Sequence, residues 1–102
     1  MSIVSLTKAC SFSADEKQKY KRTVYSVVSS AMSELGELAE EITISENQSY
    51  KTSSDDGVVG EAIDAIICLL DLIHVHNPDI TEEQIEIIAT RKLTKWISCI
   101  SN

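Results

Sequence analysis

Acidic residues recur at helical spacing in two separate parts of the sequence. Glu34, Glu37 and Glu41 lie within the stretch SELGELAEEI, and Glu61 and Asp64 follow later in the chain. Like charges three or four residues apart destabilise a helix unless solvent or a cation compensates them. At 100° per residue, the first three glutamates fall within about 60° of one another, beside the apolar stripe of their helix. This arrangement favours binding of a cation, whereas Glu40 points elsewhere, toward solvent.

The second acidic set belongs to a segment that is otherwise almost entirely apolar. Between Val58 and Val75, the residues Glu61, Asp64, Cys68 and Asp71 form a single polar line about 80° wide. Carboxylates are rarely placed in so apolar a helix without a specific partner. For Glu34 and Glu37 alone, a solvated helix face remains an alternative, because glutamate is a good helix former.

The two acidic helices are expected to pack against each other. Short connections favour antiparallel neighbours, which would bring Glu34 and Glu37 opposite Glu61 and Asp64. Four half-buried carboxylates repel one another and raise their pKa values unless a dication lies among them. A donor set of oxygen atoms alone suits Mg²⁺, or Mn²⁺, better than zinc. These four residues are therefore our candidate metal ligands.

Two short motifs carry a family resemblance. The E-x-x-E sequence ELGE (Glu34–Glu37) and the E-x-x-D sequence EAID (Glu61–Asp64) resemble the paired motifs of the MazG-type all-α nucleoside triphosphate pyrophosphohydrolases. The surrounding GELAEE and EAIDAIICLLDL are similar to that family's second and third helices, and the resemblance covers roughly residues 20–98.

The resemblance implies a hydrolase that cleaves a (d)NTP between the α and β phosphates, giving a nucleoside monophosphate and pyrophosphate. Such an enzyme would remove a particular nucleotide from the pool. The metal would neutralise the phosphates and lower the pKa of a bound water. Glu37 and Glu41 are then candidate catalytic residues, with Glu41 also a candidate ligand of a second metal ion. The family often has an acidic residue where this chain has Ser33, so the number of metal ions stays open.

A basic cluster near the C-terminus offers positive charge for the substrate. Arg91, Lys92 and Lys95 lie in the sequence RKLTKW and resemble the family's basic segment that meets the phosphates. Lys92 and Lys95 are three residues apart and share a helix face, so we favour them over Arg91. Trp96 continues the apolar stripe and is expected in the core rather than against a base.

The expected architecture is all-α, a four-helix bundle-like protomer in a single domain over residues 1–102. Helices are predicted from a Ser13–Glu16 capping box near Ala14 to about Ile44, from Val58 to the sequence HNPD, and from a Thr81–Gln84 capping box onward. A short strand at residues 2–6 stays open. The helix predicted from Val58 is apolar around most of its circumference, which predicts a homodimer or a dimer of dimers.

Composition narrows the class of protein. A net charge of −7 argues against a nucleic-acid polymer or an anionic membrane as the main partner. Three carboxylates in the most apolar segment argue against a membrane span. Three cysteines without C-x-x-C spacing are expected to be free, buried thiols, which suits the cytoplasm. We expect no signal peptide at the N-terminus.

Several interpretations compete with the main one. His74 and His76 are expected at the surface or capping a helix end, and Tyr20, Tyr25 and Tyr50 are equal candidates for stacking on a base. A phosphoribosyl-ATP pyrophosphohydrolase would share the fold and the reaction type. The alternative of another class is a non-enzymatic acidic helical module that dimerises or acts as an adaptor.

Overall fold

The computed structural model describes residues 2–17, 22–47, 51–53 and 55–101. These residues form four helices and no strand: α1 (Ile3–Lys17), α2 (Val24–Ser45), α3 (Gly57–His76) and α4 (Glu82–Ser101). The all-α prediction is therefore confirmed. None of the described helices is both long and apolar enough to cross a lipid bilayer.

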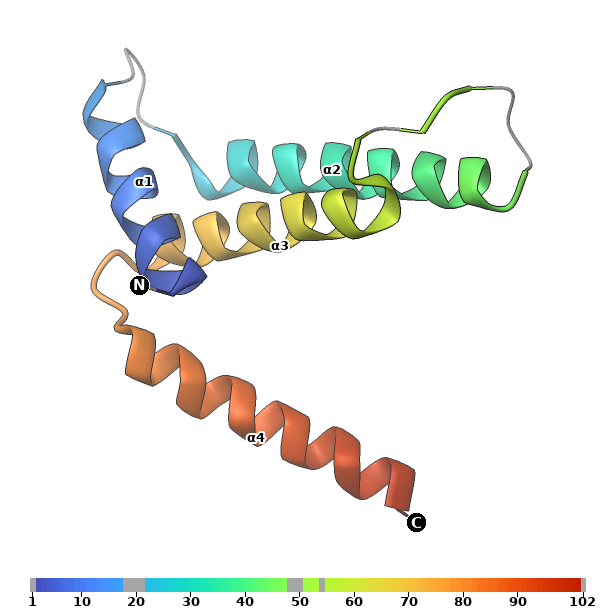
Figure 1. The fold of residues 1–102 in the computed structure, drawn as a ribbon. Coiled ribbons are helices and arrows are strands. Elements are labelled where there is room, and N and C mark those ends of the chain that lie inside the picture. Colours follow the sequence, from blue (N-terminus) through green and yellow to red (C-terminus); the bar gives the residue numbers. More distant parts are fainter. Residues whose placement is uncertain (1, 18–21, 48–50, 54, 102) are drawn as a thin grey trace.

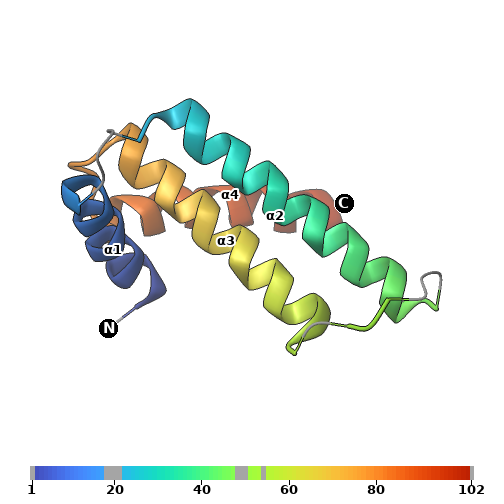
Figure 2. The ribbon, with the colours of Figure 1, turned by 90° about the horizontal axis from the view of Figure 1, so that it is seen from above.

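Helices α2 and α3 form the central pair and run antiparallel (Figures 1 and 2). Helix α1 packs across the C-terminal half of α3. The buried apolar side chains, Val27 and Ala31 on α2 and Ala65 on α3, lie in this central pair. Ala31 lies one turn before Glu34, and Ala65 directly follows Asp64, so these buried residues neighbour the acidic residues of the pair.

The single helix predicted from Ala14 to Ile44 is wrong. Helix α1 ends at Lys17, and α2 begins only at Val24. Thr23 and Ser26 explain the new start, because the Ser26 amide donates to Thr23 Oγ1 (3.1 Å) and the Thr23 amide donates to Ser26 Oγ (3.0 Å). This reciprocal capping box satisfies two amides at the helix end.

The N-terminal segment is helical, so the strand considered at residues 2–6 is absent. The Ser5 amide donates to Ser2 Oγ (3.1 Å), which places a serine cap before α1. The expected capping pair Ser13 and Glu16 lies inside α1 instead of starting a helix.

The predicted end of α3 is correct to within one residue, and the predicted start of α4 is confirmed. Helix α3 ends at His76, directly before Asn77 and Pro78. The Gln84 amide donates to Thr81 Oγ1 (3.1 Å) and the Thr81 amide donates to Gln84 Oε1 (2.9 Å), which completes the predicted capping box of α4.

Helix α4 diverges from the α2–α3 pair (Figure 1). Its apolar residues remain in solvent, and the Trp96 side chain is 64% exposed. The prediction that Trp96 lies in the core is therefore wrong for a single protomer. The three cysteines are free as predicted, but their predicted burial is wrong, since Cys10 and Cys99 are exposed and Cys68 is only half-buried. No large side chain of the described residues is completely buried, so one protomer has a small core.

Candidate metal centre

Three carboxylates meet on one side of the α2–α3 pair. Glu34 of α2 and Glu61 and Asp64 of α3 each contribute one oxygen, and these three oxygens lie within 4.8 Å of one another. Glu34 and Glu61 are half-buried, whereas Asp64 is exposed. The antiparallel packing around Ala31 and Ala65 brings the two motifs together as the sequence predicts.

The charge on Glu34 is poorly compensated. Burial raises the pKa of Glu34, and the neighbouring Glu37, Asp64 and Glu61 raise it further. Its Oε2 atom is buried and has no hydrogen-bond partner among the described residues. A buried carboxylate oxygen without a donor is costly in free energy. A cation between these side chains would remove both penalties.

The three carboxylates could hold a small hard dication. In an octahedral Mg²⁺ site, with each ligand about 2.1 Å from the metal, neighbouring ligands are about 3.0 Å apart and opposite ligands about 4.2 Å. The oxygens of Glu34, Glu61 and Asp64 lie within 4.8 Å of one another, so the side chains would have to move closer together around a bound ion. The set contains oxygen atoms only, as Mg²⁺ and Mn²⁺ prefer.

The other two acidic candidates on α2 lie outside this group of three. Glu37 is exposed and lies close enough to Glu34 to raise its pKa. Glu41 is only 5% exposed, and its Oε2 accepts a hydrogen bond from Ser53 Oγ (2.8 Å) in the connection to α3. The structure thus unites three of the four predicted metal ligands, with Glu37 beside them. Glu40 is exposed as expected, and it pairs with Lys51 (2.8 Å).

The nearby thiol is not set up as a soft metal ligand. Burial raises the pKa of Cys68, and the negative charges of Glu34, Asp71, Asp64 and Glu37 raise it further. A metal-binding or nucleophilic cysteine needs the opposite shift. The candidate centre therefore remains a carboxylate site.

Asp71 continues the acidic line of α3 but has a different role. Its two oxygens accept from Nη1 (2.6 Å) and Nη2 (3.1 Å) of Arg22. Arg22 Nε also donates to Asp15 (2.7 Å), and Nη2 donates to the carbonyl and hydroxyl of Ser11. Arg22 therefore joins α1 to α3 just before α2 begins. Sequence reasoning missed this residue because the extent of α1 was not recognised.

The expected surface position of His74 is wrong, whereas its place in the last turn of α3 is as expected. The side chain is 4% exposed rather than at the surface, because α1 covers this end of α3. His76, two residues later, is exposed as expected.

The basic and aromatic candidates for substrate binding lie away from the carboxylates or outside the described residues. Arg91, Lys92 and Lys95 are exposed on α4, which diverges from the α2–α3 pair. Tyr25 is exposed at the start of α2. Tyr20 and Tyr50 fall outside the described residues. One protomer therefore does not bring its own lysines to its own carboxylates.

Comparison of the chain with protein-family models, curated proteins and solved structures found no match. The MazG-type resemblance therefore rests on the motif residues.

Proposed function

We propose that the protein is a Mg²⁺-dependent nucleoside triphosphate pyrophosphohydrolase. It would cleave a (d)NTP between the α and β phosphates, yielding a nucleoside monophosphate and pyrophosphate. The observation that carries the proposal is the group formed by Glu34, Glu61 and Asp64, with an unpartnered buried oxygen on Glu34. These residues are also those that the paired motifs single out.

Each acidic residue has a defined part in this reaction. Glu34, Glu61 and Asp64 would hold the cation and thereby position the phosphate chain against it. Bound Mg²⁺ neutralises phosphate charge and makes a coordinated water more acidic. Glu37, exposed beside Glu34, would accept a proton from the attacking water or complete the ligand set. Glu41 accepts a hydrogen bond from Ser53. It would help to position Glu37, the second glutamate of ELGE, which lies one turn away.

The enzyme would work as a homodimer or a dimer of dimers. Large apolar side chains on all four helices are exposed in the protomer, including Met32, Ile66, Leu69 and Leu93. A large exposed apolar patch on a protein surface is typical of an interaction site. A small chain with few buried side chains also gains most from association.

A metal titration separates this proposal from the adaptor alternative. A metal-binding enzyme should melt at a higher temperature in Mg²⁺ or Mn²⁺, because a ligand at a hundred times its dissociation constant adds about 2.7 kcal/mol. For an adaptor whose acidic face is only solvated, the melting temperature should rise no more than it does in a monovalent salt of the same ionic strength. Glu61→Gln should abolish the shift, whereas Glu40→Gln removes the same charge from an exposed position and should retain it.

A substrate panel tests the reaction itself. The panel contains canonical and modified (d)NTPs together with phosphoribosyl-ATP, and pyrophosphate release is measured with Mg²⁺ present. We expect release from at least one triphosphate with the wild-type protein and loss of release with Glu61→Gln. Turnover of phosphoribosyl-ATP alone would move the assignment to that related activity.

A further inference from the structure

The imidazole of His74 is buried without a hydrogen-bond partner. Its side chain is 4% exposed, at the end of α3 that α1 covers. Neither ring nitrogen has a hydrogen-bond partner among the described residues. The Val4 backbone lies near enough to affect the pKa of the ring, but it is not placed to form a well-aligned hydrogen bond. A buried polar group without a partner is costly in free energy, so a ligand that bonds to the ring would stabilise this end of the molecule.

The His74 ring lies against a small, partly enclosed cavity between α1 and the chain that follows α3. The cavity has a volume of about 70 Å³ and is lined by Lys8, Ser11, Phe12, Asp15, His74 and Pro78. A water molecule needs about 10–15 Å³ of such space. The cavity can therefore hold several waters or one small polyatomic ion.

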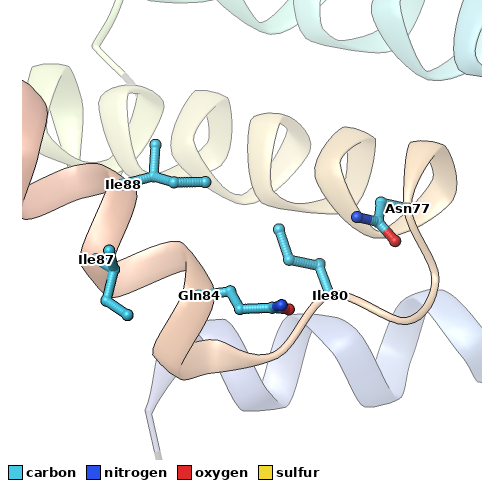
Figure 3. Close-up of a pocket in the computed structure, with 5 residues that line it drawn as sticks. All are labelled: Asn77, Ile80, Gln84, Ile87 and Ile88. Atoms are coloured by element: carbon cyan, nitrogen blue, oxygen red, sulfur yellow. The ribbon is translucent and has the colours of Figure 1, made fainter.

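A larger hollow lies at the elbow between α3 and α4, but its lining is of another kind. It measures about 290 Å³, and Figure 3 shows the side chains around it: Asn77, Ile80, Gln84, Ile87 and Ile88. None of these side chains carries a charge. The cavity beside His74 is therefore the better suited of the two to an ion.

The charges around the small cavity cancel before His74 is counted. Lys8 and Arg22 are positive, whereas Asp15 and Asp71 are negative and pair with Arg22 at 2.7 and 2.6 Å. A bound cation would be repelled by the Lys8 ammonium. Protonation of His74 would add one positive charge beside Lys8. An anion that binds together with this proton would leave the site neutral.

Two further ionisable side chains at this end of the molecule do not line the cavity. Glu82, the first residue of α4, accepts a hydrogen bond from the Ser5 hydroxyl. His76 follows His74 by two residues and is exposed. The charged groups of the preceding paragraph therefore determine the electrostatic environment of the buried ring.

The hydrogen-bond donors at the cavity match the oxygens of a small oxyanion. Lys8 Nζ donates one hydrogen bond to the Ile80 carbonyl (2.9 Å) and carries two further N–H groups. Ser11 Oγ accepts from Arg22 Nη2 (3.0 Å), so its own hydrogen can be donated to a ligand. A protonated His74 adds donors at the ring nitrogens.

We propose that this cavity binds a small tetrahedral oxyanion, phosphate or sulfate, between the Lys8 ammonium and the protonated imidazole of His74. Because Lys8 also holds the Ile80 carbonyl, the bound ion joins α1, the end of α3 and the chain just before α4. Binding takes up a proton, so it strengthens as the pH falls. The site is separate from the candidate metal centre, because Asp64 precedes His74 by ten residues, about 15 Å along α3. The proposal does not depend on nucleotide cleavage.

Proton NMR of the histidines tests this proposal on the wild-type protein. The chain contains two histidines, His74 and His76, so each spectrum includes its own control. Both rings are titrated between pH 5 and 8 in sodium sulfate and in sodium chloride of the same ionic strength. Sulfate keeps its charge over this range, so any dependence of its binding on pH arises from the protein.

We expect sulfate to raise the pKa of His74 and to leave the pKa of His76 unchanged, because the ion binds the protonated form of the buried ring. Equal pKa values of His74 in the two salts would show that the cavity holds water alone. Equal changes at both histidines would show a general effect of the salt. Either result would overturn the proposal.

Titration calorimetry measures the binding of sulfate directly. We expect saturable binding of one ion per chain, with an association constant that rises by up to about tenfold from pH 7.5 to pH 6.5, because only the protonated fraction binds. Lys8→Met should abolish this binding. Lys17→Met removes the same charge from an exposed position at the end of α1 and should retain it.

Circular dichroism first confirms that both lysine variants keep the helix content of the wild type. Unchanged binding in Lys8→Met, equal losses in the two variants, or binding that does not saturate would contradict the proposal. Orthophosphate should compete with sulfate for the same site, and a lack of competition would contradict it as well.

Discussion

Glu34 of the candidate centre carries a negative charge that its surroundings compensate poorly. It is half-buried, lacks a donor for Oε2 and faces three other carboxylates. Glu34→Gln should therefore raise the melting temperature of the metal-free protein, because an amide carries no charge and can donate a hydrogen bond. The same variant should lose the stabilisation by Mg²⁺. Differential scanning calorimetry with and without chelator measures both effects.

The matched control for this prediction is Glu40→Gln. Glu40 lies on the same helix but is exposed and paired with Lys51 at the surface. Its substitution should change stability by less than about 1 kcal/mol and leave the response to Mg²⁺ intact. A Glu34→Gln protein that melts lower than wild type without metal would show that the Glu34 carboxylate is satisfied by the protein itself.

His74 should make stability depend on pH. Burial lowers the pKa of His74 below its ordinary 6.5, and Lys8 lowers it further, whereas the Val4 backbone and Asp71 raise it in part. Between the folded pKa and 6.5 the unfolded chain binds more protons, so the free energy of unfolding falls as the pH falls below 6.5. Urea unfolding at pH 7.5 and 5.5 should show a smaller loss for His74→Gln than for wild type. The exposed His76→Gln should behave as wild type; equal losses in all three proteins would contradict this prediction.

At the scale of the helices, the sequence predicted those ends that local chemistry determines. The Thr81–Gln84 capping box and Pro78 define the start of α4 and the end of α3 from adjacent residues alone. The break between α1 and α2 was missed, because residues 17–23 contain no proline or glycine that would signal the end of a helix. The Thr23–Ser26 box lacks the glutamate that identifies such caps in a sequence.

Arg22 should determine whether α1 stays docked. Its side chain is 16% exposed, and it pairs with Asp71 and Asp15. Arg22→Ala leaves Asp71 half-buried without its cation, which should lower the free energy of unfolding by about 2–3 kcal/mol, somewhat less than for a fully buried pair. Arg22→Lys should recover only part of this, because an ammonium cannot reproduce the two-pronged contact. Urea unfolding measures the change; a loss no larger than that of Glu40→Gln would contradict it.

At the scale of the whole molecule, the acidic half of the candidate site was predictable and the basic half was not. Glu34, Glu61 and Asp64 lie close together. This could be predicted, because helical periodicity places each residue on a face and a short connection favours antiparallel packing of the two helices. The position of Lys92 depends on the direction of α4. The start of α4 is held by Lys8 and Ser5 of α1, which are far from it in the sequence. The low burial of Trp96 has the same origin.

Association should be measurable in the stability of the whole protein. If α4 is covered only in an oligomer, folding is coupled to assembly, and the melting temperature should rise with total protein concentration. Calorimetry over a hundredfold concentration range checks this. Trp96→Glu should melt lower than wild type at high concentration and show no concentration dependence. A wild-type melting temperature that is constant across the range would contradict assembly-coupled folding.

The proposed reaction is the cleavage of a nucleoside triphosphate between its α and β phosphates. Phosphorus NMR of the substrate panel with Mg²⁺ identifies the products directly. We predict that at least one triphosphate gives a nucleoside monophosphate and pyrophosphate in equal amounts, and that Glu61→Gln gives neither. No turnover across the panel, release of orthophosphate with a nucleoside diphosphate, or unchanged turnover in Glu61→Gln would contradict the claim.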